Sequence, residues 1–263
     1  MIDFAHSHDV RIGIQLAHAG RKAGTMLPWD DHRIATIAEG GWQAVSSSAI
    51  AFEGYAEPRA LTIAEIHQLT QDFVAAAVRA VKIGFDVIEL HAAHGYLFHQ
   101  FYSPLANQRT DEYGGEFANR TRFLLETVAA VRKAIPTGTP LFVRISATDW
   151  VDDGWNLIDS VELCAQLKAL GVDLVDVSTG GNVHNAPIKA TPGFQVPFAT
   201  RGGADQIEAR AKKRPDSGVT VIEVPNTAET CSEVMTCSIG PETATKPSLI
   251  NKACVVPTGI SSM

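Results

Sequence analysis

Two short stretches, GFDVIEL at 84–90 and GVDLVDV at 171–177, are near-copies of each other and decide the fold. Each begins with a glycine that ends a helical pattern and continues as an apolar run typical of a buried strand. The stretch LFVRIS at 141–146 follows another helical pattern in the same way. Helix, Gly or Pro, then strand, repeated along a chain, is typical of parallel βα units. The helices are predicted from a capping box at Thr62–Glu65 to Gly84, over 118–135 and over 157–170.

A fourth strand is predicted within VRIGIQLAH at 10–18, and residues 24–60 are expected to form a long loop region. No GxGxxG motif follows this first strand, which argues against an open dinucleotide-binding sheet. Polar residues stand at the C-terminal ends of the strands, where a (β/α)8 TIM barrel carries its active site. We therefore expect an α/β fold that is an incomplete (β/α)8 barrel, because only four clear strands are present.

Composition excludes several classes of protein. The 263 residues carry a formal net charge of −7, which argues against a nucleic-acid partner or a membrane surface. No apolar run of about 18 residues and no signal peptide is present, and none of the four Cys forms a CxxC motif, so we expect a cytoplasmic protein. Residues 200–263 contain no Phe, Trp or Tyr and can bury little apolar surface. A folded domain over 1–199 and a mostly irregular tail over 200–263 are therefore predicted.

The motif His91-Ala-Ala-His94-Gly-Tyr96 follows directly on a predicted strand. Two imidazoles at a strand end can donate hydrogen bonds to one oxygen and stabilise negative charge that develops on it. Tyr96 could then deliver a proton. Two alternatives remain open: one histidine satisfies a buried carbonyl while the other is solvated, or both bind a metal together with His18 and Asp149.

Gln15 and Arg144 are polar residues within otherwise apolar strands. An amide both donates and accepts, so Gln15 suits a flat ring edge such as a flavin pyrimidine, or else a core hydrogen bond to the backbone. A guanidinium in a buried strand needs an anionic partner. For Arg144 that partner is either a bound ligand such as a flavin or a carboxylate at the strand ends such as Glu89.

Five stretches in a fixed order carry a family resemblance: GIQLAHAGRKA at 13–23, HAAHGYL at 91–97, SPLANQRTDEYGG at 103–115, VRISATD at 143–149 and PGFQVPF at 192–198. Together they resemble the old yellow enzyme family of flavin-dependent ene-reductases, in its shorter bacterial-type branch. The resemblance covers about residues 5–199.

This resemblance implies an FMN-binding (β/α)8 barrel. In such enzymes NAD(P)H reduces FMN, and the flavin passes a hydride to the activated C=C bond of an enone or enal. His91 and His94 would hold the carbonyl oxygen of this small-molecule substrate, and Tyr96 would be the proton donor. Gln15 and Arg144 would contact the isoalloxazine ring, and no metal is implied.

The family's pattern is incomplete in this chain. Barrel strands one and two would lie upstream of Met1, strand eight is missing, and GVTVIEVPNTAE at 218–229 resembles a remnant of strand seven. We therefore expect strands three to six and a degenerate or frameshifted tail over 200–263. Unpaired strand edges favour a homo-oligomer, and missing phosphate contacts predict weak FMN binding. Three hypotheses follow: an FMN-dependent oxidoreductase, a non-catalytic relic of that family without FMN, and a metal-dependent barrel hydrolase.

Overall fold

A computed structural model of the chain describes residues 1–27 and 34–200, with two short strands at 220–222 and 236–238. Its centre is a parallel sheet with the strand order β1-β4-β5-β6. Successive βα units with neighbouring parallel strands are the arrangement of a barrel segment, as the sequence predicts. The four strands are β1 (Gly13–Leu16), β4 (Val87–Ala92), β5 (Leu141–Ser146) and β6 (Leu174–Ser178).

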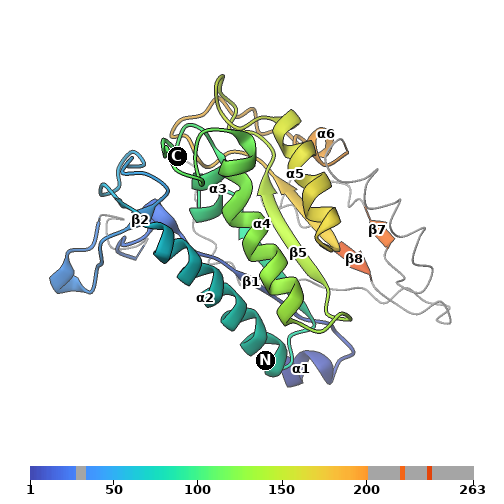
Figure 1. The fold of residues 1–263 in the computed structure, drawn as a ribbon. Helices are drawn as coiled ribbons and strands as arrows, with labels where there is room; N and C mark the ends of the chain where they lie inside the picture. The colour runs from blue at the N-terminus through green and yellow to red at the C-terminus, as the bar shows by residue number, and fades with distance from the viewer. Residues whose placement is uncertain (28–33, 201–219, 223–235, 239–263) are drawn as a thin grey trace.

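Three long helices cover one face of this sheet (Figure 1). Thr62 and Glu65 form the predicted capping box at the start of the first of them, with the Glu65 amide donating to the Thr62 hydroxyl at 3.3 Å. Gly84, with φ +102°, follows the end of that helix, a conformation that glycine adopts without strain. The helices are α2 (Ile63–Lys82), α4 (Phe117–Ala134) and α5 (Leu157–Ala169), close to the predicted ranges.

The remaining elements are short. One of them, α3, is not predicted by hydrophobic periodicity, because all six of its residues are buried and it has no polar face. In its described part, the predicted loop region over 24–60 contains a 3-10 turn, one pair of two-residue strands and an isolated bridge between Thr25 and Ile34. These elements are α1 (Ile2–His6), η1 (Gly20–Lys22), η2 (Ile37–Glu39), β2 (Val45–Ser46), β3 (Arg59–Ala60), α3 (Leu97–Tyr102) and α6 (Val196–Ala199).

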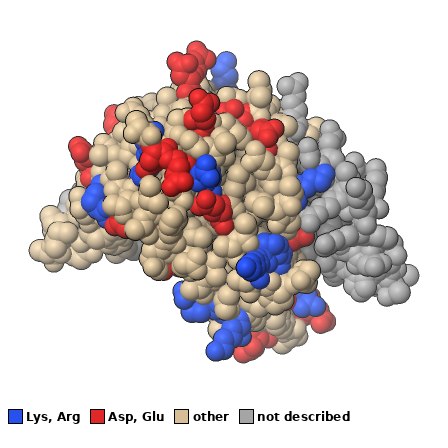
Figure 2. All heavy atoms as spheres, in the orientation of Figure 1, with Lys and Arg blue, Asp and Glu red and all other residues tan. Residues whose placement is uncertain are grey.

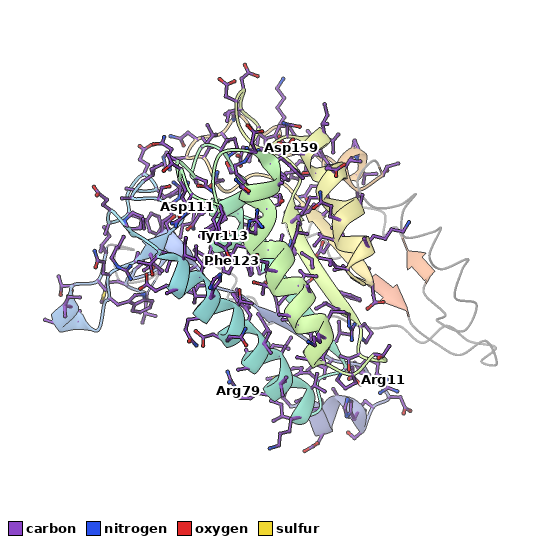
Figure 3. All side chains as sticks on the ribbon, in the orientation of Figure 1. Arg11, Arg79, Asp111, Tyr113, Phe123 and Asp159 are labelled. Atoms are coloured by element: carbon purple, nitrogen blue, oxygen red, sulfur yellow. The ribbon has the colours of Figure 1, made fainter. Side chains whose placement is uncertain are left out.

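The main hydrophobic core lies between the sheet and the helices. Ile88 and Leu90 of β4 are fully buried in it, as is Phe123 of α4. Phe123 and Tyr113, which are labelled in Figure 3, both pack against Phe101 of α3. Each such side chain contributes about 1.5–3 kcal/mol through burial, so this layer fixes the sheet on which the site is built.

Two short strands, β7 (Thr220–Ile222) and β8 (Thr236–Ser238), form a separate antiparallel pair. This differs from the parallel pairing with β6 that a seventh barrel strand at 218–229 would require. Strands close in sequence pair antiparallel at a lower entropic cost than a parallel crossover demands. Apart from these two strands, the predicted irregular tail over 200–263 lies outside the described residues.

The surface of the described residues carries mixed charge. Lys and Arg alternate with Asp and Glu over the face seen in Figure 2, and they do not gather into one basic patch there. Within 1–27, 34–200 and the two short strands, no helix is long and apolar enough to cross a membrane.

Candidate active site

The polar candidates share one face of the sheet, opposite the long helices. The strand register pairs Gln15 with Glu89, His91 with Arg144, and Arg144 with Asp176. Paired residues of parallel strands project to the same side, and alternate residues of one strand do so too. The N-terminal half of this face is apolar, with Val87, Phe142 and Leu174 in a small cluster. Its C-terminal half is polar, and we call the residues Gln15, Glu89, His91, Arg144 and Asp176 the polar face.

The two histidines of the HAAHGY motif lie together at the end of β4. Their ring centroids are 5.1 Å apart, and the ring of Tyr96 lies 4.9 Å from that of His91. The His94 ring is fixed by a 2.6 Å hydrogen bond between its Nε2 and the hydroxyl of Ser178 at the end of β6. The structure thus brings the three predicted catalytic residues into one cluster.

Both imidazoles are neutral near pH 7. Burial, reinforced by the positive charge of Arg144, lowers the pKa of His91 and that of His94 to about 3 each. A neutral imidazole carries one N–H and can donate one hydrogen bond. The Nδ1 atom of His91 is buried and has no hydrogen-bond partner among the described residues. The cluster therefore has hydrogen-bonding capacity available for a ligand.

Gln15 and Arg144 each meet a carboxylate of the chain itself. The Gln15 amide donates to Glu89 Oε2 at 2.8 Å, and Arg144 Nε lies 3.6 Å from Asp176 Oδ2. The expected carboxylate beside Arg144 is therefore present, but it is Asp176 and not Glu89, the example given from the sequence, because the register places Asp176 beside Arg144 and Glu89 beside Gln15. Arg144 Nε still makes no hydrogen bond within the described residues, although it is buried.

A second cation, which sequence reasoning did not single out, lies beside the histidines. Lys22 donates to the carbonyl oxygens of His94, at 3.0 Å, and of Gly181. Its ammonium also lies 4.1 Å from the ring centroid of Phe52, a cation–π contact. Burial, and then the charge of Arg21, lowers the pKa of Lys22 to about 8. Lys22 thus joins the loop after β4 to the loop after β6.

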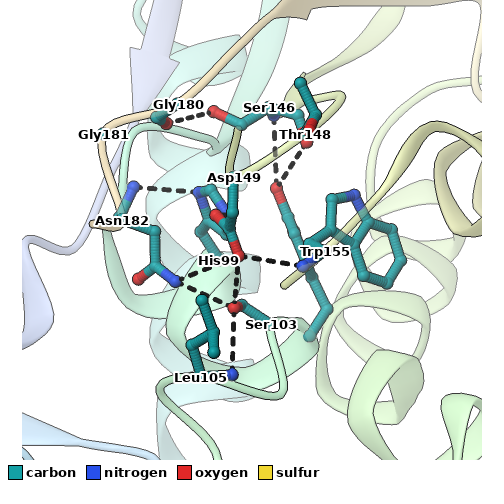
Figure 4. A network of polar contacts seen from close by, with 12 residues as sticks. His99, Ser103, Leu105, Ser146, Thr148, Asp149, Trp155, Gly180, Gly181 and Asn182 are labelled. Atoms are coloured by element: carbon teal, nitrogen blue, oxygen red, sulfur yellow. Dashed lines mark hydrogen bonds and ion pairs between the residues drawn. The ribbon is translucent and has the colours of Figure 1, made fainter. Parts of the chain in front are cut away.

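The alternative metal ligands do not converge on the histidine pair. His18 Nδ1 accepts a hydrogen bond from the Gly20 amide at 3.0 Å, and Asp149 Oδ1 accepts one from His99 at 2.8 Å. Among the described residues, no group of three or more His, Cys, Asp or Glu side chains is arranged to hold a metal ion. His99 and its partner Asp149 instead belong to a buried polar network (Figure 4), which contacts the backbone of Gly95 next to His94.

A comparison of the sequence with models of known protein families assigns the chain to a family. The sequence model of the NADH:flavin oxidoreductase / NADH oxidase family matches residues 1–252. The chain belongs to this family. The resemblance to old yellow enzymes that the sequence motifs carry is thereby confirmed, and the match extends past Thr200 into the tail.

Curated relatives of this oxidoreductase family support the same assignment. An NADH:flavin oxidoreductase of Gibberella zeae is 49% identical over 214 residues, which are 74% of this chain and 52% of that protein. An NADPH dehydrogenase of Listeria welshimeri is 47% identical over 200 residues, or 76% of this chain and 54% of that protein. The chain therefore spans about half the length of the curated relatives it matches.

Solved structures of the family share the fold. The old yellow enzyme homologue from Zymomonas mobilis is 28% identical, with a TM-score of 0.54 over 67% of this chain and 50% of that one. Histamine dehydrogenase from Rhizobium sp. 4-9 is 27% identical, with a TM-score of 0.62 over 81% of this chain and 32% of that one. The predicted partial (β/α)8 barrel is confirmed by these neighbours.

Proposed function

We propose that the polar face and the HAAHGY cluster serve FMN-dependent ene-reduction, in which NAD(P)H is the reductant and an α,β-unsaturated carbonyl compound is the substrate. The observation that carries the proposal is the neutral His91–His94 pair beside Tyr96, on the same sheet face as Gln15 and Arg144. The family and its NADPH dehydrogenase relatives support the same chemistry.

The residues present fit the ring portion of FMN. Arg144 Nε and His91 Nδ1 are buried polar atoms without hydrogen-bond partners in the described part of the chain, as expected where a polar ligand belongs. Gln15 keeps its amide oxygen as an acceptor while its nitrogen donates to Glu89. Gln15 and Arg144 would therefore hold the edge of the isoalloxazine ring, and the guanidinium would favour its anionic reduced form.

Bound FMN would supply the hydride transfer in both half-reactions. His91 and His94 would each donate one N–H to the substrate's carbonyl oxygen, which draws electron density away from the β-carbon. His94 would donate from Nδ1, because its Nε2 then accepts from the Ser178 hydroxyl. Because both rings are neutral, they bind this oxygen without giving up a proton to it. The hydroxyl of Tyr96 would then donate the proton to the α-carbon. The ring centroid of Tyr96 lies 4.9 Å from that of His91.

Three other expectations stay predictions. Residues 1–199 are proposed as one partial barrel domain, with 200–263 as a separate tail. Copies of the chain are proposed to associate through β1 and β6, the outer strands of the four-stranded sheet. A cytoplasmic location is proposed from the sequence alone.

The proposal is tested with purified chain, saturating FMN, NADPH and 2-cyclohexenone as a probe enone. His91→Asn and His94→Asn should each lower enone turnover about 100-fold, as expected for loss of one donor to a developing oxyanion. Tyr96→Phe should slow turnover while flavin reduction by NADPH continues. The exposed His8→Asn is the matched control and should leave turnover unchanged.

Turnover that survives both histidine substitutions would contradict the assigned roles. A chain that takes up no flavin and reduces no enone would favour the non-catalytic alternative, in which the site residues persist without the cofactor.

A further inference from the structure

His94 lies in a backbone turn of an uncommon conformation. His94 has φ +59° and the following Gly95 has φ +69°, so two successive residues adopt the left-handed region. That conformation costs a non-glycine residue about 1 kcal/mol. The direction of the His94 side chain depends on this turn, so contacts elsewhere must hold the turn in place.

Both backbone polar groups of Gly95 are bound by side chains of α3. The Gly95 amide donates to His99 Nδ1 at 2.9 Å, and the Gly95 carbonyl accepts from Gln100 Nε2 at 2.7 Å. His99 and Gln100 are fully buried. Because the Gly95 amide donates to His99 Nδ1, the ring N–H that donates to Asp149 Oδ1 at 2.8 Å is that of Nε2.

Asp149 is the centre of this network (Figure 4). Its Oδ2 atom accepts from the Ser103 hydroxyl at 2.6 Å, the Trp155 amide at 2.9 Å and the Asn182 amide at 3.4 Å. Burial opposes ionisation, but His99 and these donors hold the pKa of Asp149 below its usual value. Asp149 is therefore a buried carboxylate whose oxygens both accept hydrogen bonds.

Asn182 connects Asp149 to a second left-handed turn. Gly181, with φ +87°, packs against the His94–Gly95 turn so closely that a Cβ atom on Gly95 would lie 2.2 Å from the Gly181 oxygen. Asn182 Oδ1 also accepts from Arg21 at 2.9 Å. The His94–Gly95 turn and the Gly181 turn therefore pack against each other. Asp149 is connected to the first turn through His99 and to the second through Asn182.

We propose that Asp149 is a positioning residue for His94. Through His99 it fixes the His94–Gly95 turn, and through Asn182 it fixes the Gly181 turn packed against it. The role of His94 in binding a carbonyl oxygen rests on the proposed function, but the holding of the turn does not depend on a bound flavin.

The test is amide hydrogen exchange, measured by mass spectrometry on peptides that cover 91–99 in the flavin-free full chain. In Asp149→Asn, the new NH2 group must face either the Trp155 amide or the Nε2–H of His99, and both are donors, so neither orientation of the side chain satisfies the network. The exchange rate of the Gly95 amide should rise at least about tenfold, because the amide loses one buried hydrogen bond. Ser160→Ala is the control, because Ser160 is a buried partner of Trp155 Nε1 in the same region but does not contact the turn.

Two substitutions of His99 separate its two contacts. His99→Asn keeps an acceptor near Gly95 but is too short to reach Asp149, whereas His99→Gln can reach Asp149 but loses the acceptor for Gly95. The proposal expects faster exchange at Gly95 in both variants. Wild-type protection in His99→Asn would show that the Asp149 contact is dispensable and would overturn the proposal.

Unchanged exchange at Gly95 in Asp149→Asn would also overturn the proposal. So would an increase in exchange that is equal over the whole chain and is matched by Ser160→Ala. Failure of the wild-type chain to reduce an enone would count against the proposed function alone, since the exchange experiment uses no flavin.

Discussion

Lowering the pH from 7 to 5 should destabilise the protein through His91 and His94. Burial, with nearby positive charge, lowers the pKa of each to about 3, against 6.5 for a free side chain. The unfolded chain then binds more protons than the folded one below pH 6.5, so stability falls as the pH drops and continues to fall until about pH 3. Each histidine accounts for about 2 kcal/mol between pH 7 and 5, and the pair for about 4 kcal/mol. That loss is large beside a typical stability of about 5–15 kcal/mol.

Urea unfolding at pH 7, 6 and 5 measures this loss. The double variant His91→Asn/His94→Asn cannot take up these protons, so most of the pH dependence should disappear in it. A residual slope is expected from His18, because burial also lowers its pKa. The exposed His8→Asn variant should keep the full wild-type slope.

A free energy of unfolding that stays level between pH 7 and 5 would refute the reasoning, because it would mean that the two rings protonate equally in the folded and unfolded chain. An equal slope in the wild type and the double variant would refute it as well, since other groups would then carry the effect.

Three further substitutions test the local geometry by urea unfolding. Gly95→Ala should cost more than Gly54→Ala, because both positions have positive φ but only at Gly95 would the new Cβ collide with backbone; equal costs would contradict this. Thr62→Ala should cost about 1 kcal/mol through loss of the α2 capping box, and a neutral result would count against that cap. Lys22→Met should cost about 2 kcal/mol, because the charged hydrogen bond to the His94 carbonyl is lost, and an unchanged midpoint would show that this contact is not stabilising.

Much of the fold could be predicted because its determinants are local. The capping box at Thr62–Glu65 and the glycine at 84 mark the two ends of α2 from adjacent residues alone. The LFVRIS strand was located to the residue, since a β-branched apolar run bounded by Pro140 has few alternatives. In contrast, α3 escaped prediction because burial on every side removes the periodicity that marks a helix.

The residues of the candidate site could be predicted from the sequence, but which of them contact each other could be predicted less well. His91, His94 and Tyr96 lie within six residues on one strand end, so their clustering follows from local geometry. The partner of Arg144 depends on the register between β5 and β6, which sequence does not specify, and it is Asp176.

The supporting network was missed for the same reason. His99 meets Asp149 across 50 residues of chain, and Asn182 meets Ser103 across 79. Fully buried polar side chains of this kind carry no periodic or motif signal, and only the packed loops bring them together.

The central claim is that the polar face holds the flavin ring, and an FMN titration followed by flavin fluorescence tests it most directly. Riboflavin should serve as a second probe, since it shares the ring but lacks the phosphate. The account predicts weak but saturable binding of both FMN and riboflavin. The affinity for each should fall about tenfold in Arg144→Met and in Gln15→Leu, because each variant loses one hydrogen bond from a charged or polar group to the ring. Absence of saturable binding, or binding that neither variant weakens, would contradict it.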